Sequence, residues 1–192
     1  GHFDAYTTHE MTGFAIKVAD TALADAIDLL ADLVAHPRFD QEDLEREQRV
    51  ILEEMKMVED TPDELLGELF NAAYFPDQPL GRPIEGTRET VPTFDHKTTL
   101  AFHAREFSYP NLVIAAAGNV DHGRLLELVG RSLDGCEGGT NTRARVPIGT
   151  RPRPASPILI EQKNELEQAH LVIATPWPDA LSEDRYAASL LA

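Results

Sequence analysis

The sequence predicts an α+β fold, layered as helices that cover a mixed and largely antiparallel sheet. Two observations support this class. Apolar residues recur every three or four positions in several segments, as they do along the buried face of a helix, and these segments alternate with short runs rich in β-branched and aromatic residues that are typical of strands. Hydrophobic residues make up 42% of the 192-residue chain, which is enough to form a packed core.

The N-terminal part predicts strand structure followed by three helices. Residues 5–18 are rich in Thr, Tyr, Phe, Ile and Val and predict one bent strand or two short ones, broken near His9 and Glu10. The first two helices begin at an Asp, which is a favoured N-cap residue, and Pro37 ends the first of them. The expected helices run from Asp20 to His36, from Asp40 to Asp60 and from Asp63 to Phe75.

The second half of the chain predicts further helices and strands around a linker. Residues 76–92 form a turn-rich loop with two glycines and four prolines. From Gly135 to Pro157 the chain is rich in Gly, Pro, Thr and Arg and loses its periodicity, which predicts a linker at 141–157 between domains at 1–140 and 158–192. The expected helices cover 93–107, 121–133 and the residues from Ser182 onward, and the expected strands cover 112–117, 158–161 and 169–175.

Composition and charge exclude several classes of protein. The formal net charge is −16, from 33 acidic and 17 basic residues, and such a surface repels nucleic acid. The same charge favours basic peptides or basic partner surfaces, although it can equally serve solubility. No apolar run approaches the ~20 residues that span a bilayer, so we expect no membrane partner. The single cysteine, Cys136, excludes an internal disulfide framework and fits a cytoplasmic location.

The helix expected over 40–60 carries the strongest candidate for chemistry. Glu47 and Glu54 are seven residues apart, and on an α-helix such positions lie within about 20° of each other. They border the apolar stripe of this helix, so their carboxylates can point into a half-buried cleft and bind a metal or transfer a proton. The alternative is a solvated acidic face with ion pairs such as Glu42 with Arg46, and spacing alone favours this alternative.

The histidines give a weaker metal signal. None of the seven stands in an H-x-x-E-H or H-x-x-x-H motif. His2 and His9 would lie ~23 Å apart on an extended segment, which is too far to share one ion with Glu10 unless the chain turns. We therefore expect both to be surface histidines.

Short segments spread over the chain carry a family resemblance. Residues 47–55 read E-Q-R-V-I-L-E-E-M, and E-D-T-P follows at 59–62. This arrangement resembles the E-R-x-V-I-x-x-E stretch and following D-x-P of the insulinase/pitrilysin (M16) zinc metallopeptidases. The resemblance continues, in order, at residues 1–12, 79–87, 109–120, 167–171 and 184–186. It implies the repeated half-domain of that family, with a truncated first half-domain before the predicted linker and the start of the second after it.

The resemblance also implies a zinc site and assigns roles to residues of this chain. Family members use the inverted motif H-x-x-E-H, whose histidines bind zinc and whose glutamate is the general base. A downstream helix supplies a third ligand, and Glu54 is at the matching position. Glu47 matches a second family glutamate, which supports catalysis without binding the metal. Asp4, Ala5 and Tyr6 match the edge strand that pairs with extended substrate peptides, although Asp4 replaces the usual Asn.

In the family the H-x-x-E-H motif precedes the segment that opens this chain. The resemblance therefore implies that the motif lies upstream of Gly1 and that the chain is an internal fragment of the catalytic domain. The full-length parent is then expected to be a zinc endopeptidase that hydrolyses peptides or unfolded segments and that forms homo- or heterodimers through its half-domains. The chain alone is expected to bind no zinc and to be inactive. The alternative is a non-catalytic scaffold or partner subunit of an insulinase-family heterodimer, and the presence of both glutamates favours the peptidase.

Overall fold

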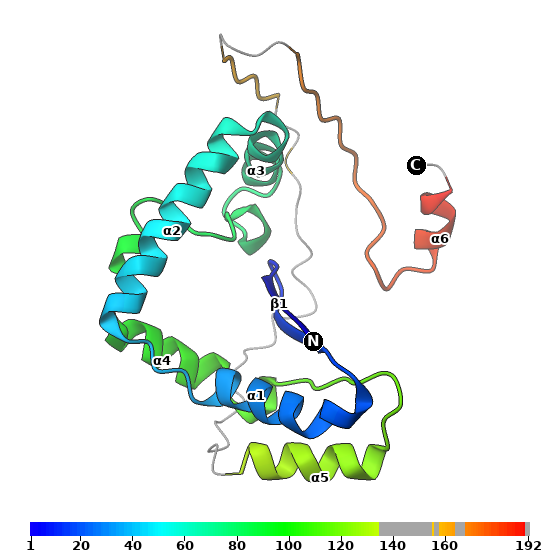
Figure 1. Cartoon of the computed structure of the whole chain (residues 1–192). Coiled ribbons are helices and arrows are strands. Elements are labelled where there is room, and N and C mark those ends of the chain that lie inside the picture. Colours follow the sequence, from blue (N-terminus) through cyan, green and yellow to red (C-terminus); the bar gives the residue numbers. More distant parts are fainter. Residues whose placement is uncertain (135–154, 156–157, 164–167, 191–192) are drawn as a thin grey trace. The chain divides into compact units, whose positions relative to one another are not determined.

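The chain forms two compact units in which helices dominate (Figure 1). The residues that the computed structural model describes are 1–134, 155, 158–163 and 168–190. The first unit contains Gly1–Glu54 and Ile84–Arg151, and the second contains Met55–Pro83 and Pro152–Ala192. Among the described residues the strands form one two-stranded antiparallel sheet. The predicted α+β class is confirmed, with a smaller sheet than expected.

The N-terminal segment forms a β-hairpin, which agrees with the prediction of two short strands. β1 (His2–Thr7) pairs antiparallel with β2 (Thr12–Lys17) along its whole length. Thr8 closes the turn between them, because its backbone N–H donates to the Met11 carbonyl over 2.8 Å and its hydroxyl oxygen accepts from the Met11 N–H over 3.2 Å. The break therefore falls where the sequence placed it, near His9.

The hairpin keeps its two histidines apart. His2 pairs with Lys17 at the open end, whereas His9 and Glu10 lie in the turn at the other end. The chain does turn between them, but the turn brings strand residues together and leaves the two histidines at opposite ends. Both side chains are exposed, as expected for surface histidines.

α1 (Leu23–Ala35) starts later than predicted. Asp20 is not its N-cap, because the chain first makes a 3-10 turn at Asp20–Ala22. The Asp20 carboxylate accepts instead from the Thr21 N–H over 2.9 Å and from Asn119 Nδ2 over 2.6 Å. The second of these contacts joins residues that are distant in sequence, and no local pattern encodes it.

α5 (His122–Ser132) packs against α1 and matches its prediction closely. Asp121 precedes it as the N-cap, and the Asp121 carboxylate accepts from the Arg124 N–H over 2.8 Å. Such a contact satisfies one of the backbone donors that the first turn of a helix leaves unpaired.

α2 (Gln41–Asp60) and α3 (Pro62–Tyr74) follow each other with one residue between them, Thr61. Both ends of α2 and both ends of α3 lie within one residue of the prediction. Pro62 occupies the first turn of α3, where its missing N–H has no intrahelical partner to lose. The Thr61 hydroxyl donates to the Met57 carbonyl over 2.8 Å, which satisfies a carbonyl in the last turn of α2.

α4 (His96–Glu106) begins with a capping box that the sequence analysis did not identify. The Asp95 carboxylate accepts from the Thr98 N–H over 2.7 Å, and the Thr98 hydroxyl oxygen accepts from the Asp95 N–H over 3.0 Å. The Thr98 hydroxyl and backbone N–H together hold the pKa of Asp95 below its usual range. Short 3-10 turns also occur at Pro79–Gly81, Val91–Thr93 and Tyr109–Asn111.

The strands predicted at 112–117, 158–161 and 169–175 are wrong as paired strands. These segments lack a hydrogen-bonded neighbour among the described residues, and large apolar side chains stand in solvent, with Val113 93% exposed and Ile173 85% exposed. A run rich in β-branched residues favours extended backbone, but a strand exists only where another strand pairs with it.

The C-terminal part contains α6 (Asp184–Ser189), which starts two residues after the predicted position at Ser182. Most of the predicted linker at 141–157 lies outside the described residues. The division into domains at 1–140 and 158–192 therefore stays a prediction. None of the described helices has the length and hydropathy needed to cross a bilayer.

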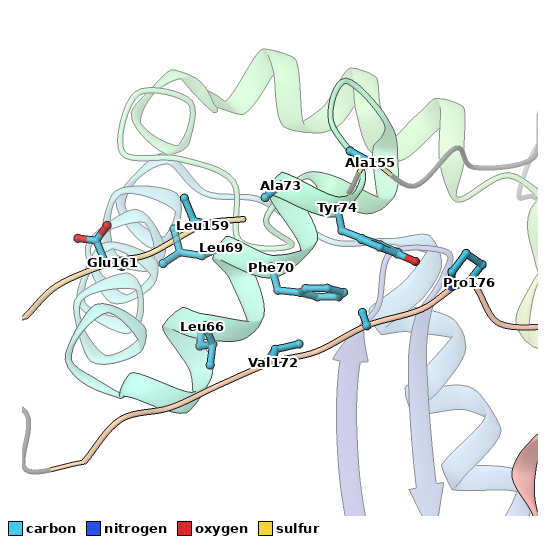
Figure 2. A pocket seen from close by; sticks show the side chains of 11 residues that line it. Leu66, Leu69, Phe70, Ala73, Tyr74, Ala155, Leu159, Glu161, Val172 and Pro176 are labelled. Carbon is cyan, nitrogen blue, oxygen red and sulfur yellow. The ribbon is translucent and has the colours of Figure 1, made fainter. Parts of the chain in front are cut away.

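The second unit contains an apolar groove of about 280 Å³ beside α3 (Figure 2). The α3 residues Phe70 and Tyr74, whose rings stack 4.9 Å apart, line one side of it. Val172 and Pro176 of the extended C-terminal segment line the other side. His170 Nδ1 of that segment contacts the carboxylate of Asp63, in the first turn of α3. The apolar face of α3 thus lines the groove together with the C-terminal segment.

Gly81→Ala is expected to destabilise the second unit by about 1–3 kcal/mol. A Cβ on Gly81 would lie 2.2 Å from the Phe75 carbonyl oxygen and 3.1 Å from the Asn71 carbonyl oxygen, so the loop would have to move away from the end of α3. In a chain of this size the change lowers the Tm by several degrees. Thermal unfolding followed by circular dichroism measures it.

Gly67→Ala is the matched control for this substitution. Gly67 lies inside α3, and a Cβ there would meet nothing within 4 Å. Because alanine is a better helix former than glycine, this variant should gain about 0.5–1 kcal/mol. A Gly81→Ala protein as stable as wild type would contradict the close approach of this loop to α3.

Candidate active site

Glu47 and Glu54 lie on one face of α2, as their spacing predicts. Ile51, between them along the helix, is half-buried, and Met55, directly after Glu54, is buried with 7% of its surface exposed. Both glutamates are themselves exposed. Their carboxylates therefore border the buried stripe of α2, where a ligand on the surface can reach them.

The two carboxylates differ from other acidic groups of α2 in their contacts. Asp43 pairs with Arg46 over 2.8 Å, and Glu45 accepts from Gln41 Nε2 over 3.0 Å. The pair between Glu42 and Arg46 that the sequence suggested is thus replaced by one with Asp43. In the described part of the chain, the carboxylates of Glu47 and Glu54 take part in no hydrogen bond or ion pair. Their oxygens are available to a partner from elsewhere.

The donors of this chain do not make a complete zinc site. A catalytic zinc ion takes three protein ligands and a water. No group of three His, Cys, Asp or Glu residues suited to a metal is present in the ranges that the structure describes. A glutamate oxygen is a common zinc ligand, so Glu54 fits the role of one ligand and the chain leaves the others unfilled. No reaction step through zinc follows from these residues alone.

The predicted substrate residues lie in the middle of β1. Asp4 is opposite Ala15, Ala5 is opposite Phe14, and Tyr6 is opposite Gly13. Because side chains alternate along a strand, Asp4 and Tyr6 share the face of the hairpin opposite to that of Ala5.

The Tyr6 ring lies across Gly13. A Cβ built on Gly13 would come within 2.4 Å of Tyr6 Cζ, so the glycine makes room for the ring. All three predicted substrate residues are exposed, and among the described residues β1 pairs only with β2. The second edge of β1 thus lacks a strand partner in this part of the chain.

Sequence reasoning did not find the side chains that hold α2 in place. Gln48, next to Glu47, donates from Nε2 to the Phe94 carbonyl over 2.9 Å. Phe94 belongs to the segment before α4, 46 residues away in sequence. A contact of this range leaves no periodic or motif signal, so it could be found only from the structure.

Two family models together cover most of the chain. The model for insulinase (peptidase family M16) matches residues 1–88, and the model described as the peptidase M16 inactive domain matches residues 93–192. The two matched ranges follow each other along the chain.

Similar proteins in several bacteria carry the description of uncharacterized zinc protease. One from Mycobacterium leprae is 35% identical over 195 residues, which covers 100% of this chain and 43% of that protein. One from Streptomyces coelicolor is 34% identical and covers 100% of this chain and 42% of that protein. The chain thus spans less than half the length of these relatives.

Solved structures share the fold. A putative M16-like peptidase from Alicyclobacillus acidocaldarius superposes with a TM-score of 0.63 at 22% identity, over 80% of this chain and 33% of that one. A chain of complex III2 from Candida albicans gives a TM-score of 0.61 at 22% identity, over 73% of this chain and 34% of that one.

The family models assign the chain to family M16, which is also the family that the segment from Glu47 to Glu54 resembles. The relatives' descriptions as zinc proteases agree with it too. The chain belongs to the insulinase family of metallopeptidases, family M16.

Proposed function

We propose that the full-length protein is a zinc-dependent endopeptidase and that this chain supplies Glu54 as one zinc ligand. The observation that carries the proposal is the pair of exposed carboxylates on one face of α2, at the positions that match the family glutamates, with no partner among the described residues. Glu47 supports the reaction from the same face without binding the metal. The remaining ligands come from a part of the protein outside this chain.

Zinc, when bound, supplies a water with a pKa lowered towards ~7 and polarises the carbonyl to be attacked. Glu54 contributes a negative ligand that helps to hold the ion. A single carboxylate binds zinc weakly, because tight binding requires several deprotonated ligands in a fixed geometry. The 192-residue chain by itself is therefore inactive in this proposal.

We assign substrate binding to the edge of β1. An extended peptide adds to such an edge through backbone hydrogen bonds, with little demand on its sequence. Asp4 and Tyr6 border the edge and contact alternate side chains of the peptide. The net charge of −16 favours basic peptides at such a surface. Substrates in this proposal are short peptides or unfolded segments.

A second candidate is a non-catalytic partner subunit of a heterodimer with an active relative. The match of residues 93–192 to a model described as an inactive domain favours it. Glu47 and Glu54 give such a subunit no role, so we prefer the peptidase. Homodimer formation and a cytoplasmic location stay predictions in either case.

The proposal predicts chelator-sensitive hydrolysis by the full-length protein. Purified protein should contain about one zinc ion per active site, and it should cleave a quenched fluorescent peptide of basic, unstructured sequence. A zinc chelator should abolish cleavage, and added zinc should restore it. The chain of residues 1–192 should show no cleavage above background.

The opposite outcome separates the two candidates. A full-length protein without zinc and without cleavage, which becomes part of an active complex when a related peptidase is added, would support the partner subunit. Cleavage by the isolated 192-residue chain that a chelator blocks would contradict the assignment of Glu54 as a single ligand among several.

A further inference from the structure

Two histidines of α4 hold the connection between α1 and α2. His103 Nε2 lies 2.7 Å from the Val34 carbonyl oxygen, in the last turn of α1. His96 Nδ1 lies 2.7 Å from the Phe39 carbonyl oxygen, two residues before the start of α2. A carbonyl only accepts, so each ring nitrogen must carry a proton: Nε2–H in His103 and Nδ1–H in His96.

The connection that they hold has an unusual backbone. Phe39 has a φ of 48°, in the left-handed region that side chains other than glycine rarely adopt. Its ring meets the His103 ring edge to face at 5.5 Å, and the His103 ring stacks on Phe107 at 5.0 Å. Because the conformation of Phe39 is unfavourable by itself, these contacts from α4 keep it in place. They fix the point at which α2 begins.

Gln48 adds a third contact, two turns into α2. It donates from Nε2 to the Phe94 carbonyl over 2.9 Å, on the segment that leads into α4. A helix fixed at its start and at one side chain further along cannot turn about its own axis. Gln48 is the immediate neighbour of Glu47, so this contact fixes the direction in which Glu47 points. Glu54, about 20° further round, is fixed with it.

A zinc site tolerates only a small displacement of its ligands, so the rotation of α2 matters for the position of Glu54. A side chain reaches about 5–6 Å from the helix axis, so a rotation of about 20° moves a carboxylate by roughly 2 Å. Zinc–ligand distances must be correct to about 0.2 Å. A helix that is free to rotate by this amount therefore presents Glu54 in the wrong place most of the time.

We propose that His96, His103 and Gln48 are positioning residues that set the start and rotation of α2, and thereby the direction of Glu47 and Glu54. This inference rests on the proposed function, because the direction of Glu54 matters for the protein only if Glu54 binds zinc. The two histidines contact the chain before α2, and Gln48, on α2 itself, contacts the segment before α4. None of the three is a zinc ligand in this proposal.

The two histidines can be tested separately, because asparagine and glutamine replace different ring nitrogens. The amide nitrogen of Asn takes the place of Nδ1, and that of Gln takes the place of Nε2. In the full-length protein, H96N should keep zinc affinity within about threefold of wild type, and H103Q, which keeps the hydrogen bond but loses the ring contacts with Phe39 and Phe107, should weaken it less than H103N does. H96Q and H103N should weaken it by roughly 10- to 100-fold, as the loss of supporting contacts does in other metal sites. H122N and H122Q are the controls, since His122 is an exposed histidine in the first turn of α5.

Hydrogen exchange supplies a readout that does not depend on zinc. Amides in the first turns of α2 should exchange faster in H96Q and H103N than in wild type, while those of α5 keep their rates. If the α2 amides of these two variants exchange at the wild-type rates, the inference is wrong, regardless of the change in zinc affinity. Equal weakening of zinc binding in all four variants, regardless of which nitrogen is kept, would also overturn it.

Glu54→Gln separates a failure of this inference from a failure of the proposed function. If Glu54→Gln weakens zinc binding but H96Q, H103N and Q48A do not, the positioning inference alone is wrong. If Glu54→Gln leaves zinc binding unchanged, the proposed function is wrong, and hydrogen exchange still decides whether the histidines hold α2.

Discussion

Replacing Glu54 with Gln in the full-length protein is expected to weaken zinc binding by roughly 10²- to 10³-fold and to reduce peptide hydrolysis at least as much. A four-ligand zinc site binds with about 10–16 kcal/mol, and a quarter of that free energy corresponds to this factor. The substitution keeps the size of the side chain and removes its charge. Competition with a coloured chelator measures the affinity, and cleavage of a fluorescent peptide measures the activity.

Glu45→Gln is the control for this substitution. Glu45 lies on the same helix, about 160° round from Glu47, and it is exposed. This substitution removes one negative charge from α2 but leaves the proposed ligand face unchanged, so zinc affinity and activity should stay near wild type. Full zinc content and normal cleavage in Glu54→Gln would exclude Glu54 as a ligand and, with it, the proposed site.

Glu47→Gln is expected to separate catalysis from metal binding. Because Glu47 supports the site without binding zinc, kcat should fall by roughly 10- to 100-fold while the protein still binds zinc stoichiometrically. Steady-state kinetics on the zinc-loaded protein, together with its zinc content, tests both halves of this expectation.

A comparison of zinc content and kinetics between Glu47→Gln and Glu54→Gln tests the roles assigned to the two glutamates. A loss of zinc as large as in Glu54→Gln would make Glu47 a ligand and would reverse the assigned roles. Unchanged kinetics would leave Glu47 as an ordinary surface carboxylate, which is the role that spacing alone favoured.

The helices were the predictable part of the fold, because their signals are local. An apolar stripe recurs within each helix, and a capping residue lies within three positions of the backbone N–H that it satisfies. Asp121 caps α5 in this way, and α2 and α3 keep their predicted ends to within one residue. Asp20 is not the cap of α1, because a 3-10 turn separates it from the helix, and its carboxylate accepts from Asn119, 99 residues away.

The strands were less predictable, because a strand is a property of two segments. Residues 112–117 have the composition of a strand, but the structure gives them no neighbour among the described residues. Residues 2–7 do have one, since a short turn brings 12–17 back beside them. Pattern alone therefore distinguishes extended backbone from helix and leaves its pairing open.

The candidate site was predictable in part. Periodicity alone placed Glu47 and Glu54 on one face of α2, and the structure agrees. Periodicity gave no reason to prefer a metal role over a solvated face, and that preference came from the family resemblance. The sequence could not identify the positioning residues His96, His103 and Gln48, because their hydrogen-bond partners lie 57, 69 and 46 residues away along the chain.

The extended C-terminal segments have a practical consequence for anyone who produces this chain alone. Ile158, Ile160, Leu171 and Ile173 are each at least 80% exposed. An unpaired extended backbone that carries such side chains is a template for adding strands from other molecules. We therefore expect concentrated samples of the isolated chain to self-associate through these segments, with the net charge of −16 as the main repulsion between molecules. Low ionic strength, which leaves that repulsion unscreened, is the condition in which the chain stays dispersed.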